Sequence, residues 1–321
     1  MQTNNFHHQT RKELQVSRPI YEDVVVDNKH PLPTHTHAMK RLALPSMSAA
    51  TFTLFSEYIQ EELGIKLNQN KQAMLQGRLM KRLRALGIGL YEEYYEYLFS
   101  AEGHKSELPY FVHQVTTNKT DFFREPAHFR YMAKTALSVL LNENRYSRHD
   151  PLRIWSTACS TGEEPYTLSM VMADYVEQNQ PVNFIIMATD ISPTVLQTAA
   201  HGIYESYKVD PVPHYFQKKY LLRSKDREKK VVRVVPELRS KVHFQWVNLK
   251  KRSTFNLDRR MDIIFCRNVL IYFSRKTQEL VIRNLCTQLR SGGYLFTGHS
   301  ETLSGFSLPL KQVATTIYRK K

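Results

Sequence analysis

Cysteine, glycine and long apolar runs are all scarce in this chain of 321 residues. The three cysteines, Cys159, Cys266 and Cys286, lie far apart and have none of the spacings of a metal site. We therefore expect reduced thiols in a cytoplasmic protein. No stretch approaches the roughly 18 consecutive apolar residues that a membrane span needs. Residues 1–15 are polar and lack the apolar centre of a secretory signal.

A glycine-rich phosphate motif is also missing from the one loop that resembles a nucleotide-binding loop. Residues 156–167 read STACSTGEEPYT, with a single glycine, Gly162, followed by Glu163 and Glu164. A loop between a strand and a helix usually binds phosphate through its N–H groups and the positive helix end. Two carboxylates would repel phosphate, so the loop favours a cationic ligand. Alternatively, the acidic pair only complements the helix dipole.

Acidic residues are outnumbered, since 45 Lys and Arg face 30 Asp and Glu and the formal net charge is +15. Such a charge is compatible with nucleic acid, acidic protein or anionic lipid as a partner. Between Glu205 and Arg260 there are 16 basic and 6 acidic residues, a balance of 16 − 6 = +10. Both a solvated surface and a docking face for an acidic partner would account for this run.

The N-terminal half divides into two parts. Residues 1–45 are polar and without periodicity, so we predict a disordered tail, whose histidines lack the regular spacing of a metal site. From 46 to 118, one-sided apolar stripes at helical spacing predict a small all-helical domain. Its second long helix, NKQAMLQGRLMKRLRALG, also carries a basic face that includes Arg78, Lys81 and Arg82.

From residue 151 to the end, short apolar runs alternate with amphipathic helices. This alternation predicts an α/β domain with a mostly parallel sheet covered on both faces. Such sheets bind ligands at the carboxyl ends of their strands. The polar residues expected there are Glu163, Glu164, Asp190, Asn248, Arg267, Asn268 and Tyr272.

These strand ends suit a nucleoside that carries positive charge. Asp190 ends the second predicted strand, where a carboxylate accepts the hydrogens of both ribose hydroxyls. S-adenosylmethionine has a ribose, an ammonium group and a sulfonium but no phosphate. Glu164 is a candidate partner for the ammonium, and the small residues Ala158, Ser160 and Gly162 leave room for the ligand.

The segment TTNKTDFFREPAHF, residues 116–129, precedes the α/β domain and carries polar residues around two phenylalanines. It is either a helix cap before an ordinary amphipathic helix or part of a linker and lid, 119–150, with Arg124 pointing into the site. The residue pattern alone does not decide between the two.

Six segments in this order resemble the CheR-type chemotaxis receptor methyltransferases: TTNKTDFFRE, WSTACSTGEEPYT, ATDIS with VLQTAAHGIY, FQWVNL, DIIFCRNVLIYF and GGYLFTGHSETL. The resemblance runs from about Thr51 to Tyr318. It implies a small helical N-terminal domain and a Rossmann-like S-adenosylmethionine-dependent methyltransferase domain, 151–321. A small antiparallel β-subdomain is implied as an insertion at about 205–245.

The resemblance further implies transfer of a methyl group to glutamate side chains on the cytoplasmic helices of chemoreceptors. It places Arg124 and Tyr272 nearest the transferred methyl and requires no metal. The implied cofactor-binding residues are Asn118, Thr120, Arg124, Glu164, Asp190, Asn248, Leu249, Arg267 and Asn268. The implied receptor-docking residues are Arg78, Lys81, Arg82 and Arg84. In the stretch LLRSKDREKKVVRV, the glycines that some members use to bind a receptor pentapeptide are absent, which argues against such a tether.

The motifs also fit this chemistry because they contain no general base. A glutamate side chain has a reference pKa near 4.3, so the nucleophile is already ionised at neutral pH. His299 adjoins Ser300 and Glu301, but neighbours on a strand point to opposite sides, so we interpret it as structural. Two alternatives remain, a nucleic-acid methyltransferase and a catalytically silent module that senses the cofactor.

Overall fold

The computed structural model describes residues 46–321 except 144–145, 147–149, 227 and 258, and the predicted tail at 1–45 lies outside this range. The described residues belong to one unit, Leu44–Lys321. Among them, no helix is both long enough and apolar enough to cross a bilayer.

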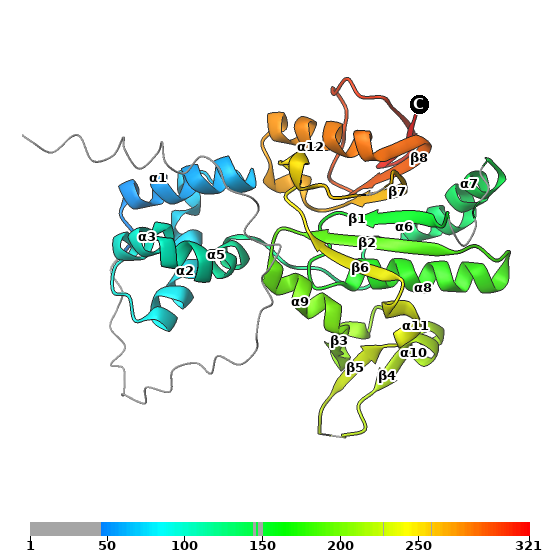
Figure 1. Ribbon diagram of the computed structural model, residues 1–321, viewed down its shortest axis with the longest axis horizontal. Helices are drawn as coiled ribbons and strands as arrows, with labels where there is room; N and C mark the ends of the chain where they lie inside the picture. Colours follow the sequence, from blue (N-terminus) through cyan, green and yellow to red (C-terminus); the bar gives the residue numbers. More distant parts are fainter. Residues whose placement is uncertain (1–45, 144–145, 147–149, 227, 258) are drawn as a thin grey trace, which may run out of the picture. The chain divides into compact units, whose positions relative to one another are not determined.

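The first part of the described chain is helical, as predicted (Figure 1). Ser48 begins the first helix by accepting a hydrogen bond from the Thr51 N–H, which satisfies one of the free donors at the helix start. Phe55, Leu79, Tyr94 and Phe111 are fully buried and form the centre of a separate apolar core. The elements are α1 Ala49–Tyr58, η1 Ile59–Leu63, η2 Gln69–Lys71, α2 Gln72–Leu86, α3 Tyr91–Phe99, α4 Ala101–Ser106 and α5 Leu108–Val115.

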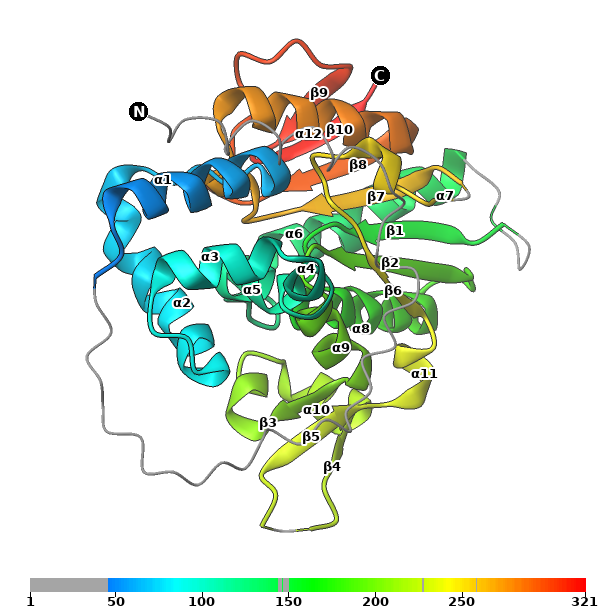
Figure 2. The same cartoon turned by 60° about the vertical axis from the view of Figure 1, so that its left-hand side comes forward.

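The second part is built on a seven-stranded sheet in the order β6-β2-β1-β7-β8-β10-β9. Strands β6, β2, β1, β7 and β8 are parallel, whereas β10 and β9 are antiparallel additions at one edge (Figure 2). The strands are β1 Leu152–Ser156, β2 Phe184–Asp190, β6 Val242–Trp246, β7 Met261–Cys266, β8 Leu289–Thr297, β9 Leu310–Ala314 and β10 Ile317–Lys320.

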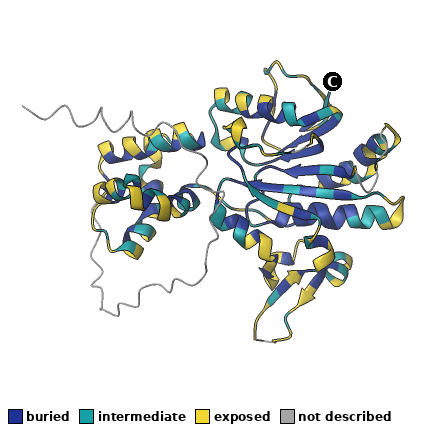
Figure 3. Ribbon diagram, in the orientation of Figure 1, coloured by how far each residue is buried: buried dark blue, intermediate teal, exposed yellow. Residues whose placement is uncertain are grey.

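Both faces of this sheet are covered, and Figure 3 shows the central strands mostly buried. Successive residues of a strand alternate between two cores: Ile154 packs with α8 residues, and Trp155 packs with α12 residues on the other face. The helices of this second part are α6 Pro126–Tyr131, η3 Met132–Ala136, α7 Leu137–Glu143, α8 Glu163–Gln178, α9 Pro193–His201 and α12 Arg275–Gln288. Short helices are η5 Arg252–Thr254 and η6 Leu270–Tyr272.

A small antiparallel sheet lies between β2 and β6 along the chain, as the resemblance implied. Its order is β3-β5-β4, with β3 Ile203–Glu205, β4 Leu221–Arg223 and β5 Val231–Val234. Three short helices accompany it, η4 Ser206–Val209, α10 His214–Tyr220 and α11 Pro236–Arg239.

The strand order places a topological switch point beside β1. After β1 the chain continues to β2 and β6 on one side, and it later returns to β7 and β8 on the other. At such a point the loops that follow neighbouring strands diverge, which leaves a crevice at their carboxyl ends.

Candidate active site

A cavity lies at the carboxyl ends of β1, β2, β6 and β7. Its walls include Thr157 and Ser160 after β1, Asp190 at the end of β2, Asn248 after β6 and Arg267 after β7. Every residue predicted for the cofactor or the reaction lines this one cavity: Asn118, Thr120, Arg124, Glu164, Asp190, Asn248, Leu249, Arg267, Asn268 and Tyr272.

Asp190 is anchored by backbone donors from the two loops beside it. Its carboxylate accepts the Ser160 N–H at 2.9 Å and the Ser192 N–H at 3.0 Å. Burial raises the pKa of this carboxyl, and the backbone N–H groups oppose the shift. Each carboxylate oxygen takes one backbone hydrogen, so lone pairs remain for further donors such as hydroxyl groups.

The first loop keeps its shape through residues with positive φ. Ser160 has φ 49° and Gly162 has φ 98°. A Cβ on Gly162 would lie 2.8 Å from the Tyr204 hydroxyl and 2.9 Å from Cβ of Ala199. The single glycine of the loop is therefore required both by its dihedral angle and by close packing.

Gly162→Ala should lower the free energy of unfolding by about 1–3 kcal/mol, the range for a residue held in a disfavoured backbone region. The matched control is Gly77→Ala, because Gly77 lies within α2 with nothing within 4 Å of its would-be Cβ. That change should stabilise the protein by about 0.5–1 kcal/mol. Urea unfolding of both variants measures the contrast, and equal effects would contradict the packing argument.

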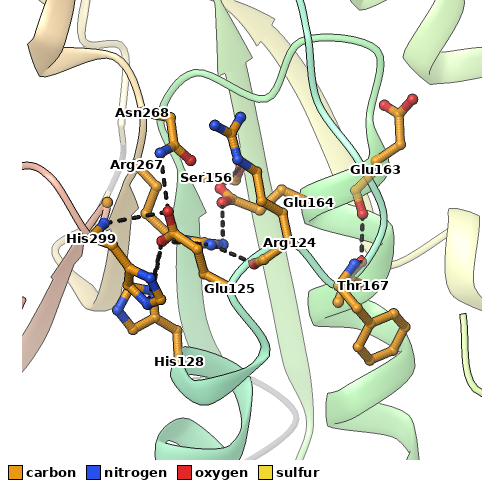
Figure 4. A network of polar contacts seen from close by, with 12 residues as sticks. Arg124, Glu125, His128, Ser156, Glu163, Glu164, Thr167, Arg267, Asn268 and His299 are labelled. Atoms are coloured by element: carbon orange, nitrogen blue, oxygen red, sulfur yellow. Dashed lines mark hydrogen bonds and ion pairs between the residues drawn. The ribbon is translucent and has the colours of Figure 1, made fainter. Parts of the chain in front are cut away.

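Arg267 is the centre of a buried ion-pair network (Figure 4). Its side chain is 2% exposed and donates to Glu164 at 2.9 Å and to Glu125 at 3.0 Å. It also donates to the carbonyl oxygen of Arg124, and its guanidinium lies over the Phe129 ring, 5.3 Å from the ring centroid. The second oxygen of Glu164 accepts the Ser156 hydroxyl at 2.7 Å. Arg267 is thus a brace between two carboxylates.

Glu163 and Glu164 point to different surroundings although they are adjacent. Glu164 lines the cavity, whereas Glu163 is 1% exposed and accepts the Thr161 hydroxyl at 2.7 Å. Burial raises the pKa of Glu163, and Lys208, at 3.8 Å, opposes this shift. Only one carboxylate of the pair therefore contributes charge to the cavity.

The loop after β7 is held by a second buried carboxylate, Glu301, which the sequence did not indicate. Glu301 accepts the N–H groups of Asn268 at 2.7 Å, Ile271 at 3.2 Å and Gly298 at 2.6 Å. Asn268 itself has φ 56° and donates its side-chain amide to Glu125 at 3.1 Å. Two carboxylates from distant segments therefore fix the loop between β7 and η6.

Arg124 extends into the cavity from an irregular segment that is firmly anchored. Phe122 is 1% exposed and packs edge-on against Tyr204, while the Phe123 N–H donates to the Thr167 hydroxyl at 3.1 Å. The guanidinium of Arg124 donates to the Lys119 carbonyl at 3.3 Å and forms no ion pair with the carboxylates of the described chain. α6 then begins at Pro126, and the predicted lid motion stays a prediction.

The helical part reaches the site through a short bridge to the loop that carries Tyr272. The Lys66 N–H donates to the Tyr272 carbonyl at 2.9 Å, and Ile65 pairs with Phe273 in an antiparallel bridge. Asn248 donates its side-chain amide to the Glu62 carbonyl at 2.8 Å. The end of η1 and the residues after it therefore help to fix both Tyr272 and the loop after β6.

The comparisons with known proteins agree with this geometry. The family model described as "CheR methyltransferase, SAM binding domain" matches residues 118–319, and "CheR methyltransferase, all-alpha domain" matches residues 50–116. The chain belongs to the CheR methyltransferase family. The predicted fold class and the predicted S-adenosylmethionine-dependent methyltransferase activity are thereby confirmed.

Curated relatives are similar over most of the chain. A chemotaxis protein methyltransferase of Borreliella burgdorferi is 35% identical over 82% of this chain and 91% of its own length. Chemotaxis protein methyltransferase 2 of Pseudomonas aeruginosa is 36% identical over 83% of this chain and 91% of its own. The chemotaxis protein methyltransferase of Salmonella typhimurium is 36% identical over 87% of this chain and 92% of its own length.

The cavity of this CheR-family chain fits S-adenosylmethionine in charge and polarity. Asp190 offers lone pairs to ribose hydroxyls, as described above, and Glu164 adds negative charge. Ile191, Leu249 and Phe129 add apolar wall on which an adenine can pack. When bound, the cofactor supplies an electrophilic methyl group.

The predicted docking residues of α2 differ in their surroundings. Lys81 and Arg84 are exposed. Arg82 forms a bidentate pair with the buried Glu107, with both contacts at 2.7 Å. Arg78 lines the cavity and donates to the Val115 carbonyl at 2.7 Å. Only Lys81 and Arg84 of this set therefore present fully exposed charge.

Several cavity residues were not predicted because they come from the helical part of the chain. They are Leu63, Ile65, Leu67, Lys71 and Met74. Met74 belongs to α2 and is 39% exposed. Its position at the edge of an apolar stripe is the sequence signal that could have identified it as a cavity residue.

Proposed function

We propose that this chain transfers the methyl group of S-adenosylmethionine to glutamate side chains on the cytoplasmic helices of chemoreceptors. The products would be glutamate methyl esters and S-adenosylhomocysteine, formed on the cytoplasmic side during sensory adaptation. The observation that carries the proposal is a guanidinium, that of Arg124, which lines the cavity without an ion-pair partner among the described carboxylates. Relatives named chemotaxis protein methyltransferase support the same reaction.

The cavity suits an acceptor that needs no deprotonation. No histidine is among the residues that line it. Burial raises the pKa of the Cys159 thiol, and the carboxylates Asp190 and Glu164 raise it further. Burial also raises the pKa of the Cys266 thiol. Neither thiol is therefore a nucleophile at neutral pH, and a glutamate acceptor arrives already ionised.

Within this proposal Arg124 and Tyr272 orient the acceptor. Arg124 would hold the incoming carboxylate by charge-assisted hydrogen bonds, and Tyr272, which also lines the cavity, would donate a further hydrogen bond. Positioning of two reactants can contribute roughly 7–11 kcal/mol to catalysis. The remaining cavity residues of the predicted set would bind the cofactor.

The receptor would approach along α2, where Lys81 and Arg84 offer exposed positive charge to acidic helices. We also propose that residues 46–118 act as the recognition domain, that 119–150 link it to the methyltransferase domain, 151–321, and that the insertion at about 205–245 does not bind a receptor pentapeptide.

Incubation with radiolabelled S-adenosylmethionine and membranes that contain chemoreceptors tests the proposal. We expect base-labile methyl esters on the receptor and stoichiometric S-adenosylhomocysteine. RNA in place of receptor should accept no label. Label on RNA but not on receptor would reject the proposal, and so would the absence of turnover from a folded chain that binds S-adenosylhomocysteine.

A further inference from the structure

A cluster of three possible metal ligands lies behind the cavity wall. One ligand atom each from Glu125, His128 and His299 lies within 4.8 Å of the others. The three residues come from the segment before α6, from α6 itself and from the turn after β8 (Figure 4). None of them lines the cavity described above. Glu125 and His128 are three residues apart, whereas His299 lies more than 170 positions further along the chain.

His128 carries an unpartnered nitrogen in this cluster. Its side chain is 2% exposed, and its Nε2 lies 2.9 Å from the Thr316 hydroxyl. That hydroxyl donates to the Thr315 carbonyl at 2.7 Å, so Nε2 carries the ring hydrogen and donates to Thr316. Nδ1 then bears a lone pair with no hydrogen-bond donor in reach.

The lone pair of His128 faces an acceptor where a donor would be expected. Nδ1 lies 3.5 Å from Oε2 of Glu125, and two acceptors cannot form a hydrogen bond with each other. Nε2 of His299 lies 3.9 Å from the same oxygen. The His299 side chain is 54% exposed, so this third ligand gives access from solvent and is free to adjust.

We propose that Glu125, His128 and His299 form a binding site for a divalent metal ion of the zinc type, with water in the fourth position. Bonds of about 2.0–2.2 Å on a tetrahedral ion separate neighbouring ligands by roughly 3.3–3.6 Å, close to the 3.5 and 3.9 Å between the two imidazoles and Glu125. Imidazole ligands favour zinc, nickel or copper over magnesium and calcium. The bond from His128 to Thr316 is the outer contact that orients a metal-bound histidine.

A metal in this site would act against the cofactor site. Glu125 also accepts hydrogen bonds from Arg267 at 3.0 Å and from Asn268 at 3.1 Å, and both of these residues line the cavity. A cation on Oε2 competes with Arg267 for the same oxygen and repels its charge. Metal binding therefore weakens the contacts of Arg267 that brace the cavity wall. By reciprocity, cofactor binding must lower the affinity for the metal ion.

Cobalt absorption on the full chain tests the site directly. To exclude any metal binding by histidines of residues 1–45, His7, His8, His30, His35 and His37 are first changed to glutamine in every sample. We expect one equivalent of Co²⁺ to give the intense visible band of a four-coordinate ion, and Zn²⁺ to displace it. His299→Ala should abolish the band. His214→Ala, which removes another exposed histidine, should leave it unchanged.

Calorimetry with S-adenosylhomocysteine tests the coupling on the same samples. Saturating Zn²⁺ should weaken binding about fivefold or more in the parent chain and have no effect in His299→Ala. A Co²⁺ band that survives His299→Ala, or no band in the parent chain, would overturn the site. Equal S-adenosylhomocysteine affinities with and without Zn²⁺ in the parent chain would overturn the antagonism.

Discussion

Arg124→Ala should lower turnover with receptor as acceptor by about a hundredfold or more, the penalty expected when a reacting group is misplaced by about 1 Å. The affinity for S-adenosylhomocysteine should fall much less. The reason is the position of the guanidinium, which lies in the cavity without a carboxylate partner and so has its charge available for the incoming acid. Removal leaves Arg267, Glu164 and Asp190 in place.

Initial rates with labelled cofactor and calorimetry with S-adenosylhomocysteine separate the two effects. Arg130→Ala is the matched control, because it removes an exposed arginine from α6 a few residues along the chain. Arg124→Lys keeps the charge but loses the planar pair of donors, so it should recover only part of the rate. Turnover of Arg124→Ala close to that of Arg130→Ala would refute the role assigned to Arg124.

The sequence was informative about the cavity because parallel strands end at a common edge. Asp190 ends the apolar strand β2 and Arg267 directly follows the apolar strand β7, and the alternation of such runs with helices indicates parallel strands of one sheet. Residues that directly follow such strands lie close together at this edge, whatever conformation the loops adopt. Apolar stripes at helical spacing predicted the helical domain, and the motif resemblance alone implied the antiparallel insertion.

What could not be predicted are contacts that depend on the exact paths of irregular segments. Glu125 has φ 56° and meets Asn268 and Arg267 across more than a hundred positions of sequence, and no periodicity encodes this encounter. Glu301 was read only as a neighbour of His299, yet it accepts three backbone N–H groups of two loops. Strands β9 and β10 are short and partly exposed, so they lack the apolar signal of the central strands.

The buried brace around Arg267 explains how negative charge is kept beside a cavity for a cationic ligand. Glu125 and Glu164 are each 13% exposed, and without a counter-charge their burial and mutual repulsion would be costly. Arg267 compensates for both carboxylates while its own exposure is 2%. The three charges sum to −1, so the Arg267 network leaves one uncompensated negative charge beside the cavity.

Arg267→Ala should therefore destabilise the protein by about 3–5 kcal/mol, the cost of breaking a buried ion pair and leaving a carboxylate uncompensated. It should also weaken the binding of S-adenosylhomocysteine, because Glu164 and Glu125, which accepts a hydrogen bond from Asn268, lose their common partner. Urea unfolding and calorimetry measure the two losses. Arg267→Lys keeps the charge but cannot span Glu125 and Glu164 with a fork, so most of the loss should remain.

Arg283→Ala is the control for this prediction. Arg283 pairs with Glu279 at 2.7 Å on the exposed face of α12, with side-chain exposures of 50% and 36%. Exposed pairs at this helical spacing contribute about 0.3–0.5 kcal/mol. Both variants remove an arginine from ion pairs with similar N–O distances. A difference between their unfolding free energies therefore reflects the burial of Arg267 and its second carboxylate partner. An unfolding free energy for Arg267→Ala within 1 kcal/mol of that of Arg283→Ala would show that the network does not brace the site.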